Sequence, residues 1–165
     1  MWIEHEGRTM YDRILVGIDG SEDAHAAAEH AVDLAATYGA TLHCLYVVET
    51  RTAYDNAIVE PETVRENLRR EGREALAGVE ATAESAGVDS VTSIEEGVPA
   101  EAIAEYGREN GIDLVVVGAR GKSAFKTILL GSTTEALVRS GLPVLVVSEG
   151  DPRPSANESH ESGGP

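Results

Sequence analysis

The sequence has 165 residues, which suits one domain with a single core, and its formal net charge at pH 7 is −16. This charge argues against nucleic acid and anionic membrane surfaces as partners, because both require a basic footprint. No stretch approaches the roughly 20 unbroken apolar residues of a membrane span, and the one cysteine, Cys44, allows no intrachain disulfide, so we expect a cytoplasmic protein with Cys44 as an inert buried thiol.

Predicted strands and helices alternate from the start of the chain. Residues 12–18 are apolar at successive positions, which is typical of a strand covered on both faces. A helix follows from Ser21, with the acids Glu22 and Asp23 in its first turn, and Gly39 ends it. The further predicted elements are strands at 41–48, 91–95, 113–118 and 143–147 and helices at 61–85, 99–109 and 132–140.

This alternation predicts an α/β fold, because strands joined by helices form right-handed crossovers in a parallel sheet. We predict a doubly wound, open, five-stranded, Rossmann-like sheet in the order 3-2-1-4-5. That order places the first and fourth strands side by side, and ligands bind at the carboxyl ends of such neighbours. The residues there are Asp19 and Gly118. The polar stretch 49–60 is too long for a tight turn, and we expect it to close over the ligand.

The ends of the chain differ in composition from the folded part. We predict a flexible N-terminal extension at 1–10, a folded domain at 11–148 and a disordered acidic tail at 149–165, which is rich in Pro, Gly, Ser and Glu. Met10 is an alternative to Met1 as the start of translation.

The net charge also carries a prediction about the solvent. A chain with 29 acidic and 13 basic residues repels itself at low salt. In molar salt the Debye length falls to about 3 Å, and this repulsion is screened. We interpret the charge as an adaptation to a salt-rich, halophilic cytoplasm. The alternative is an ordinary acidic protein with an acidic tail.

A glycine-spaced segment carries the strongest functional signal. Gly118, Gly121, Gly131 and Ser132 follow the spacing G-x2-G-x9-G-S between the end of a buried strand and the start of a helix. Glycine lets a backbone approach phosphate closely, and a helix start offers unpaired N–H groups. We therefore predict a phosphate-binding loop. The same segment places cations in an otherwise acidic protein: Arg120, Lys122 and Lys126.

Better-known phosphate motifs do not fit this segment. A Walker A loop ending in Gly121-Lys122-Ser123 needs glycine at position 116, where Val116 stands. The dinucleotide fingerprint G-x-G-x-x-G is also absent after the first strand. Two structural alternatives remain: the glycines shape a turn, or Ser132 and Glu135 form a capping box.

The early segment Ile14-Leu-Val-Gly-Ile-Asp-Gly-Ser21, the late glycine spacing and Pro143-Val-Leu-Val-Val147 together closely resemble the universal stress protein family, in its nucleotide-binding branch. The resemblance covers roughly residues 11–148. It implies an adenine nucleotide alpha hydrolase-like fold, often with bound ATP and a divalent cation, and usually a homodimer through the last strand, here Val144 to Val147. This sequence departs from the family pattern at Gly17, where Pro is common, and at Arg120, where His is common.

Carried over by position, the resemblance implies a set of nucleotide contacts. Asp19 would contact the ribose, and the backbone near Val47 would meet the adenine. Arg120 and Lys122 are possible phosphate contacts. The ribose and phosphates would be lined by Gly118, Gly121, Gly131, Ser132 and Thr133. Asp19 has a structural alternative, since it could organise the turn into the first helix.

Three functions stay open on this basis. The leading hypothesis is a stress-response regulator that uses ATP as a ligand. The second is a slow ATPase, which is disfavoured because Asp19 is the one acid at the switch point and the sequence offers no clear base for a water. For the same reason we expect no protein metal site, with Mg²⁺ held mainly by phosphate oxygens. The third is a dimeric interaction module without nucleotide.

Overall fold

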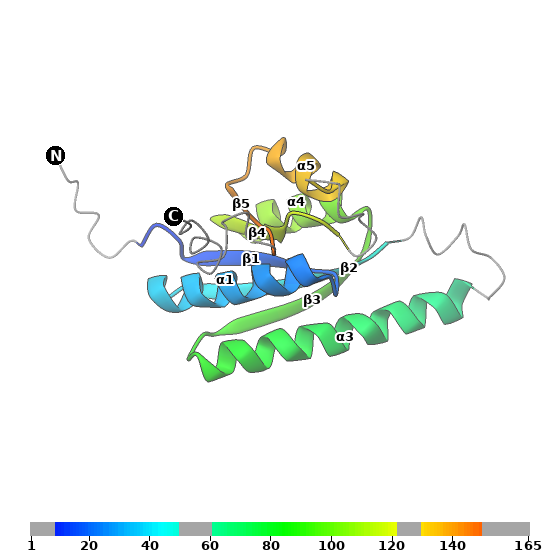
Figure 1. The fold of residues 1–165 in the computed structure, drawn as a ribbon, viewed down its shortest axis with the longest axis horizontal. Helices are drawn as coiled ribbons and strands as arrows, with labels where there is room; N and C mark the ends of the chain where they lie inside the picture. The colour runs from blue at the N-terminus through cyan, green and yellow to red at the C-terminus, as the bar shows by residue number, and fades with distance from the viewer. Residues whose placement is uncertain (1–8, 50–60, 122–129, 150–165) are drawn as a thin grey trace, which may run out of the picture.

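The computed structural model describes residues 9–49, 61–121 and 130–149. They form one five-stranded parallel sheet in the order β3-β2-β1-β4-β5 (Figure 1). The predicted topology is therefore confirmed. The strands are β1 (Arg13–Ile18), β2 (Thr41–Glu49), β3 (Ser90–Gly97), β4 (Leu114–Gly118) and β5 (Val144–Val147). The helices are α1 (Glu22–Tyr38), α3 (Pro61–Ser85), α4 (Pro99–Glu109) and α5 (Ser132–Val138).

Helices cover both faces of the sheet, with α1 and α3 on one face and α4 and α5 on the other (Figure 1). Alternation along β1 divides its side chains between two cores, because successive residues of a strand point to opposite faces. Ile14, Val16 and Ile18 face α1 and α3. Leu15 faces α4, together with Leu45 of β2. Such two-sided burial explains the unbroken apolar runs of the central strands.

Small residues let the helices lie close to the sheet. The inner face of α1 is mostly alanine, with Ala27 and Ala31 completely buried. On α3, Gly72 lies against the ring of Tyr46, and a Cβ added there would come within 2.6 Å of that ring. With an aromatic content of only 4%, the core is filled by small side chains that let the helix and sheet backbones lie close together.

Two elements differ in extent from their predictions. The third strand is longer than the predicted 91–95, because β3 pairs with β2 along eight consecutive residues and that ladder needs no apolar side chains. The last helix stops at Val138 rather than at residue 140.

The predicted extension and tail lie almost wholly outside the described residues, as does the stretch 50–60. In the described part of the chain, no helix has the length and apolar character needed to cross a membrane.

Candidate functional site

The turn after β1 brings Asp19 to the predicted switch point. β1 pairs with β2 on one side and β4 on the other, so the carboxyl ends of these three strands lie together. Gly20 makes the turn with φ of 81°, a left-handed value that glycine accepts without strain. The Ser21 N–H donates to Asp19 Oδ1 at 2.8 Å, and Ser21 Oγ accepts from the Ala24 N–H at 3.1 Å. Asp19 therefore does organise the turn into α1, which is the structural role predicted from the sequence as the alternative to a ribose contact.

The second oxygen of Asp19 faces the glycine-spaced segment. A Cβ added to Gly121 would lie 3.5 Å from Asp19 Oδ2. The carboxylate is on the exposed edge of the sheet, so one oxygen serves the turn while the other borders the segment after β4. A structural role and a ligand contact are compatible in this geometry.

The two described ends of the glycine-spaced segment meet beside Asp19. The Gly131 N–H donates to the Ala119 carbonyl at 2.6 Å. A Cβ added to Gly131 would lie 3.4 Å from that carbonyl oxygen and 3.5 Å from the Gly121 nitrogen. Gly131 has an ordinary extended conformation, with φ of −71° and ψ of 156°, and a single Cβ there would make ordinary van der Waals contacts, so only a larger, branched side chain would crowd this junction. Lys122 and Lys126 lie outside the described residues.

Val47 lies at the same edge as Asp19. The register pairs Ile18, the last residue of β1, with Tyr46, so Asp19 and Val47 each follow the last paired residues of these neighbouring strands. The Val47 side chain is half-buried and packs against the core under α4. The structure thus brings Asp19, Gly121 and Gly131 together, and places Val47 at the carboxyl end of the strand next to β1.

Gly118 has a packing role on the other face. A Cβ added there would lie 2.7 Å from the Asp23 carbonyl carbon and 2.8 Å from the Ala24 nitrogen. These are backbone atoms in the first turn of α1, and moving them would disturb the helix. Gly118 is therefore required for β4 to lie against α1, and its predicted contact with ribose or phosphate stays a prediction.

The capping-box alternative for Ser132 is wrong. The N-cap of α5 is Gly131, so Ser132 is the first helical residue and cannot cap the helix with its side chain. Glu135, the other half of the proposed box, pairs instead with Arg139 at 2.8 Å. The backbone N–H groups of Ser132 and Thr133 thus begin a helix that has no side-chain cap.

Thr134 is a site residue that the sequence prediction missed. Its hydroxyl donates to the Gly118 carbonyl at 2.6 Å, and the residue is only 4% exposed. This bond fastens the start of α5 to the end of β4. A threonine sixteen positions after its partner forms no local pattern, so this contact could not be predicted from the sequence.

Arg120 is engaged by partners on the α1 side of the sheet. Its Nε donates to Asp23 Oδ2 at 3.0 Å, and its Nη2 donates to the Glu149 carbonyl at 3.0 Å. Burial alone would raise the pKa of Asp23, but the bonds from Arg120 and Glu149 outweigh burial and lower that pKa. The prediction that Arg120 contacts phosphate stays a prediction, and the structure gives its guanidinium two other partners.

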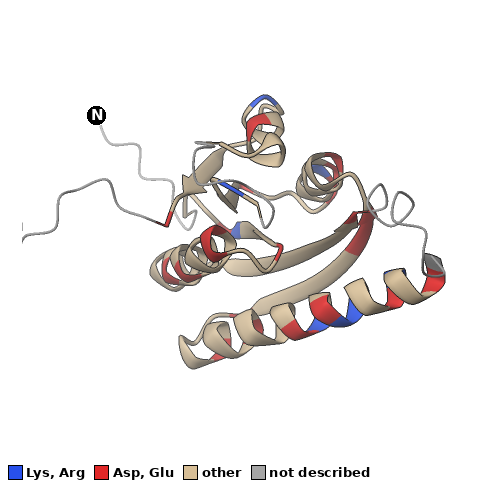
Figure 2. Cartoon of the chain, turned by 45° about the vertical axis from the view of Figure 1, so that its right-hand side comes forward, with Lys and Arg blue, Asp and Glu red and all other residues tan. Residues whose placement is uncertain are grey.

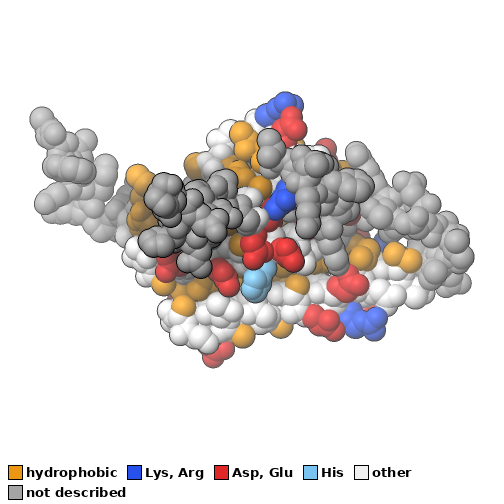
Figure 3. Space-filling view, viewed as in Figure 1, with side chains coloured by type: hydrophobic (Ala, Val, Ile, Leu, Met, Phe, Trp, Pro, Cys, Tyr) orange, Lys and Arg blue, Asp and Glu red, His pale blue; other side chains and the backbone are white. Residues whose placement is uncertain are grey.

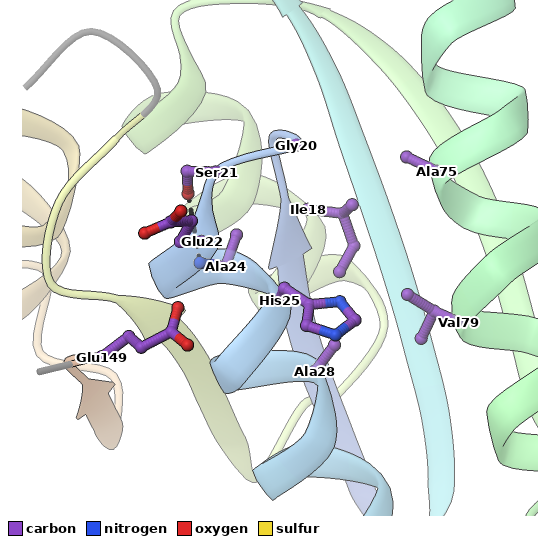
Figure 4. A pocket seen from close by; sticks show the side chains of 10 residues that line it. All are labelled: Ile18, Gly20, Ser21, Glu22, Ala24, His25, Ala28, Ala75, Val79 and Glu149. Atoms are coloured by element: carbon purple, nitrogen blue, oxygen red, sulfur yellow. Dashed lines mark hydrogen bonds between the residues drawn. The ribbon is translucent and has the colours of Figure 1, made fainter.

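A separate groove of about 390 Å³ opens between α1 and α3 (Figure 4). Its floor is apolar, with Ile18 and Val79 among the residues, while His25, Glu22 and Glu149 stand at its rim. Figure 3 shows acidic side chains gathered over α1 near the middle of this face. Gly20 and Ser21 line this groove, but Asp19, Gly118, Gly121 and Gly131 do not, so the groove adjoins the predicted ligand edge without containing its residues.

Comparisons with known proteins found relatives in both sequence and structure. The sequence matches the model of the universal stress protein family over residues 10–148. It is 37% identical over 150 residues to the universal stress protein MJ0531 of Methanocaldococcus jannaschii, covering 89% of this chain and 88% of that protein. The structure is similar to that of MJ0577 from the same archaeon, with a TM-score of 0.78, 28% identity, and coverage of 87% and 99% of the two chains. A universal stress protein in complex with cAMP is similar with a TM-score of 0.61, 28% identity, and coverage of 85% and 98%.

Proposed function

The chain belongs to the universal stress protein family, and on that premise we propose that it binds an adenine nucleotide, ATP in particular, at the carboxyl ends of β1 and β4. The observation that carries the proposal is the convergence of Asp19, Gly121 and Gly131 at this edge. A carboxylate there can accept bonds from ribose hydroxyls. The absence of side chains at Gly121 and Gly131 lets a phosphate approach the backbone closely, although the Gly131 N–H itself donates to the Ala119 carbonyl.

The remaining contacts follow from their places around this edge. In this proposal the base extends along β2, near the backbone of Val47. Ser132 and Thr133 stand beside Gly131 at the uncapped start of α5. This helix has seven residues, so its dipole adds little and the phosphates depend mainly on direct hydrogen bonds. Mg²⁺ fits as an ion held by the phosphates, because Asp19 is the one carboxylate that the described residues place beside Gly121.

The proposal gives the nucleotide the role of a ligand in a cytoplasmic stress-response regulator. One oxygen of Asp19 is occupied by the Ser21 N–H, which makes this carboxylate a poor general base for hydrolysis. A related protein with 28% identity has been crystallised with cAMP, so AMP and cAMP belong among the ligands to compare with ATP.

We also propose a homodimer through β5. This strand is the last of the sheet, and Val144, Leu145 and Val146 are only partly buried. Nearby Val138 on α5 is 55% exposed. An apolar edge strand is an aggregation hazard unless another chain covers it, and a two-fold mate does so with the same surface.

The test is calorimetric titration with ATP, AMP and cAMP in high KCl with Mg²⁺. Gly131→Val places a branched side chain against Ala119 and Gly121, and we expect ATP affinity to fall by at least about tenfold, or 1.4 kcal/mol. Asp19→Asn keeps the acceptor for the Ser21 N–H but removes the charge, so we expect weaker binding with an intact turn.

Gly78→Val is the matched control, because a Cβ at this exposed position on α3 meets nothing within 4 Å. It should bind ATP like the wild type. No binding by the wild type would overturn the proposal in favour of an interaction module without nucleotide. Phosphate release over hours, abolished by Asp19→Asn, would replace the ligand role with a slow ATPase.

A further inference from the structure

Asp23 is a buried carboxylate whose acceptor positions are filled from two distant parts of the chain. It is 4% exposed in the first turn of α1, where an acid that only complements the helix dipole would face solvent. Oδ2 accepts from the backbone N–H and the Nε of Arg120, both at 3.0 Å. Oδ1 accepts from the Glu149 N–H at 3.0 Å and from Arg120 Nη2 at 3.3 Å.

The packing of β4 makes these contacts possible. Gly118 lets the end of the strand approach the backbone of Asp23, so the carboxylate lies directly behind the next residues of the chain. Arg120 is therefore held by its backbone as well as by its guanidinium. The same guanidinium also donates to the Glu149 carbonyl, so the residues just after β5 are bonded to Arg120 and Asp23 as well.

On the opposite side of this short segment is the proposed nucleotide edge. Arg120 is followed at once by Gly121, which borders Asp19 and Gly131. Ala119, just before it, accepts from the Gly131 N–H and donates to the Val147 carbonyl at 2.8 Å. Two sets of contacts thus hold the Gly121 backbone in position. Ala119 bonds to Gly131 and Val147, and Arg120, the residue next to Gly121, bonds to Asp23 on the α1 side.

We propose that Asp23 is a positioning residue for the nucleotide site, acting through Arg120 to fix the Gly121 backbone where the ligand meets it. The inference rests on the proposed nucleotide binding. In this inference Arg120 anchors the residues before Gly121 to α1 and does not contact the phosphate.

Electrostatics favours this role over a direct phosphate contact. For Nε or Nη2 of Arg120 to turn to a phosphate, these groups would have to leave a carboxylate that is almost completely buried. Removing one member of a buried ion pair is strongly unfavourable, because the other charge is left without a partner. The pair itself is bonded through both the side chain and the backbone of Arg120, so it holds a defined geometry.

Two conservative variants test the inference by ATP titration. Asp23→Asn keeps the shape of the side chain but turns an amide toward donors, and we expect affinity to fall about tenfold. Arg120→Lys keeps the charge but loses the fork that spans Asp23 and Glu149, and we expect a similar loss. The double variant should bind no more weakly than either single variant, because both break the same unit.

A direct phosphate contact predicts the opposite result for Asp23→Asn, since releasing the guanidinium would leave ATP binding unchanged or tighten it. That outcome would overturn the inference, as would independent, additive losses in the double variant. A purely structural pair would lower the melting temperature without this coupling in affinity. Should Asp23→Asn fail to fold, Arg120→Lys still puts the inference at risk, because Asp23 keeps its bond from the Glu149 N–H in that variant. Unchanged ATP affinity in folded Arg120→Lys would also overturn the inference.

The control pair is Glu66→Gln and Arg73→Lys, an exposed carboxylate and guanidinium 3.3 Å apart on α3. Both should bind ATP within about twofold of the wild type, as expected for an exposed pair remote from the edge. If wild type and controls fail to bind, the proposed function fails and this inference with it. If they bind and both test variants bind equally well, only the inference fails.

Discussion

His43 and Asp23 are buried titratable residues, and each makes the stability of the fold depend on pH. His43 is 8% exposed, with Nδ1 2.7 Å from the Tyr106 hydroxyl. Burial, and secondly the charge of Arg13, lower the pKa of His43 from its ordinary value of 6.5. Between its lowered pKa and pH 6.5, His43 is therefore protonated in the unfolded chain but neutral in the folded chain. Its contribution to the free energy of unfolding is complete above pH 6.5 and is lost as the pH falls toward the lowered pKa.

We predict that His43→Gln weakens this acid sensitivity, because glutamine still reaches the Tyr106 hydroxyl but does not titrate. The measurement is urea unfolding at pH 7.5 and pH 5, comparing the loss of unfolding free energy with that of the wild type. His25→Gln is the control, because the His25 side chain is 77% exposed. An equal loss in all three proteins would contradict the prediction. Asp23 contributes separately below its ordinary value of 3.8, because its pKa is also lowered.

Residue roles were predictable where they follow from chain position and unpredictable where they follow from distant partners. Asp19 could be named because the strand order places the end of the first strand at the switch point, and Gly121 and Gly131 because of their spacing in the late glycine motif. The burial of Cys44 was also expected and is confirmed at 1% exposure, which raises the pKa of its thiol to about 12. Asp23 was taken as a simple first-turn acid, because its partners Arg120 and Glu149 are 97 and 126 residues away.

At the scale of elements, the contact between α3 and β2 depends on one missing side chain. A Cβ at Gly72 would lie 2.6 Å from Tyr46 Cδ1, and Tyr46 is only 7% exposed, so its ring has little room to move. We predict that Gly72→Ala destabilises the protein by about 1–3 kcal/mol through overpacking, despite the better helix propensity of alanine. Urea unfolding with an unchanged m-value measures the effect.

Gly78→Ala, on the exposed side of the same helix, is the control because its Cβ meets nothing within 4 Å. It should stabilise the protein by up to about 1 kcal/mol through helix propensity alone. Equal stabilisation by both substitutions would show that Tyr46 yields without cost and would refute the packing argument.

Element identity was easier to predict than element extent. The apolar runs of β1 and β4 mark strands covered on both faces, and the Pro and Gly positions mark most helix ends. β3 extends past its predicted bounds because backbone pairing with β2 begins already at Ser90 and continues through Glu96 and Gly97. The start of α5 was placed correctly, but its cap was not, because Gly131 takes that position and Ser132 lies inside the helix.

At the scale of the whole molecule, the chain has 29 acidic residues and only 13 basic residues, so most acids have no basic residue to pair with. Figure 2 shows acids spread over the helices, with basic residues among them on α3. Several described arginines are already bonded to acids, as when Arg69 pairs with Glu96 and Arg139 with Glu135. Most of the excess charge of −16 therefore has only solvent ions to balance it.

We predict that the melting temperature rises by at least about 5 °C between 0.1 and 2 M KCl, because salt screens the repulsion between surface carboxylates. Thermal unfolding followed by circular dichroism measures it. Sucrose at matched osmolality controls for general solvent exclusion and should give a smaller rise. A melting temperature that is equal or lower in 2 M KCl would rule out the halophilic interpretation.

The pairing of β1 with β4 has a consequence for how the chain forms as it is synthesised. Arg13 and Asp113, which meet at the start of these strands, are 100 residues apart. A ribosome has therefore made β2, α3, β3 and α4 before the second neighbour of β1 exists. Until then β1 presents an open hydrogen-bonding edge beside Ile14 and Val16, whose side chains are completely buried in the finished fold. We expect nascent chains that stop short of Leu114 to be the species that chaperones recognise.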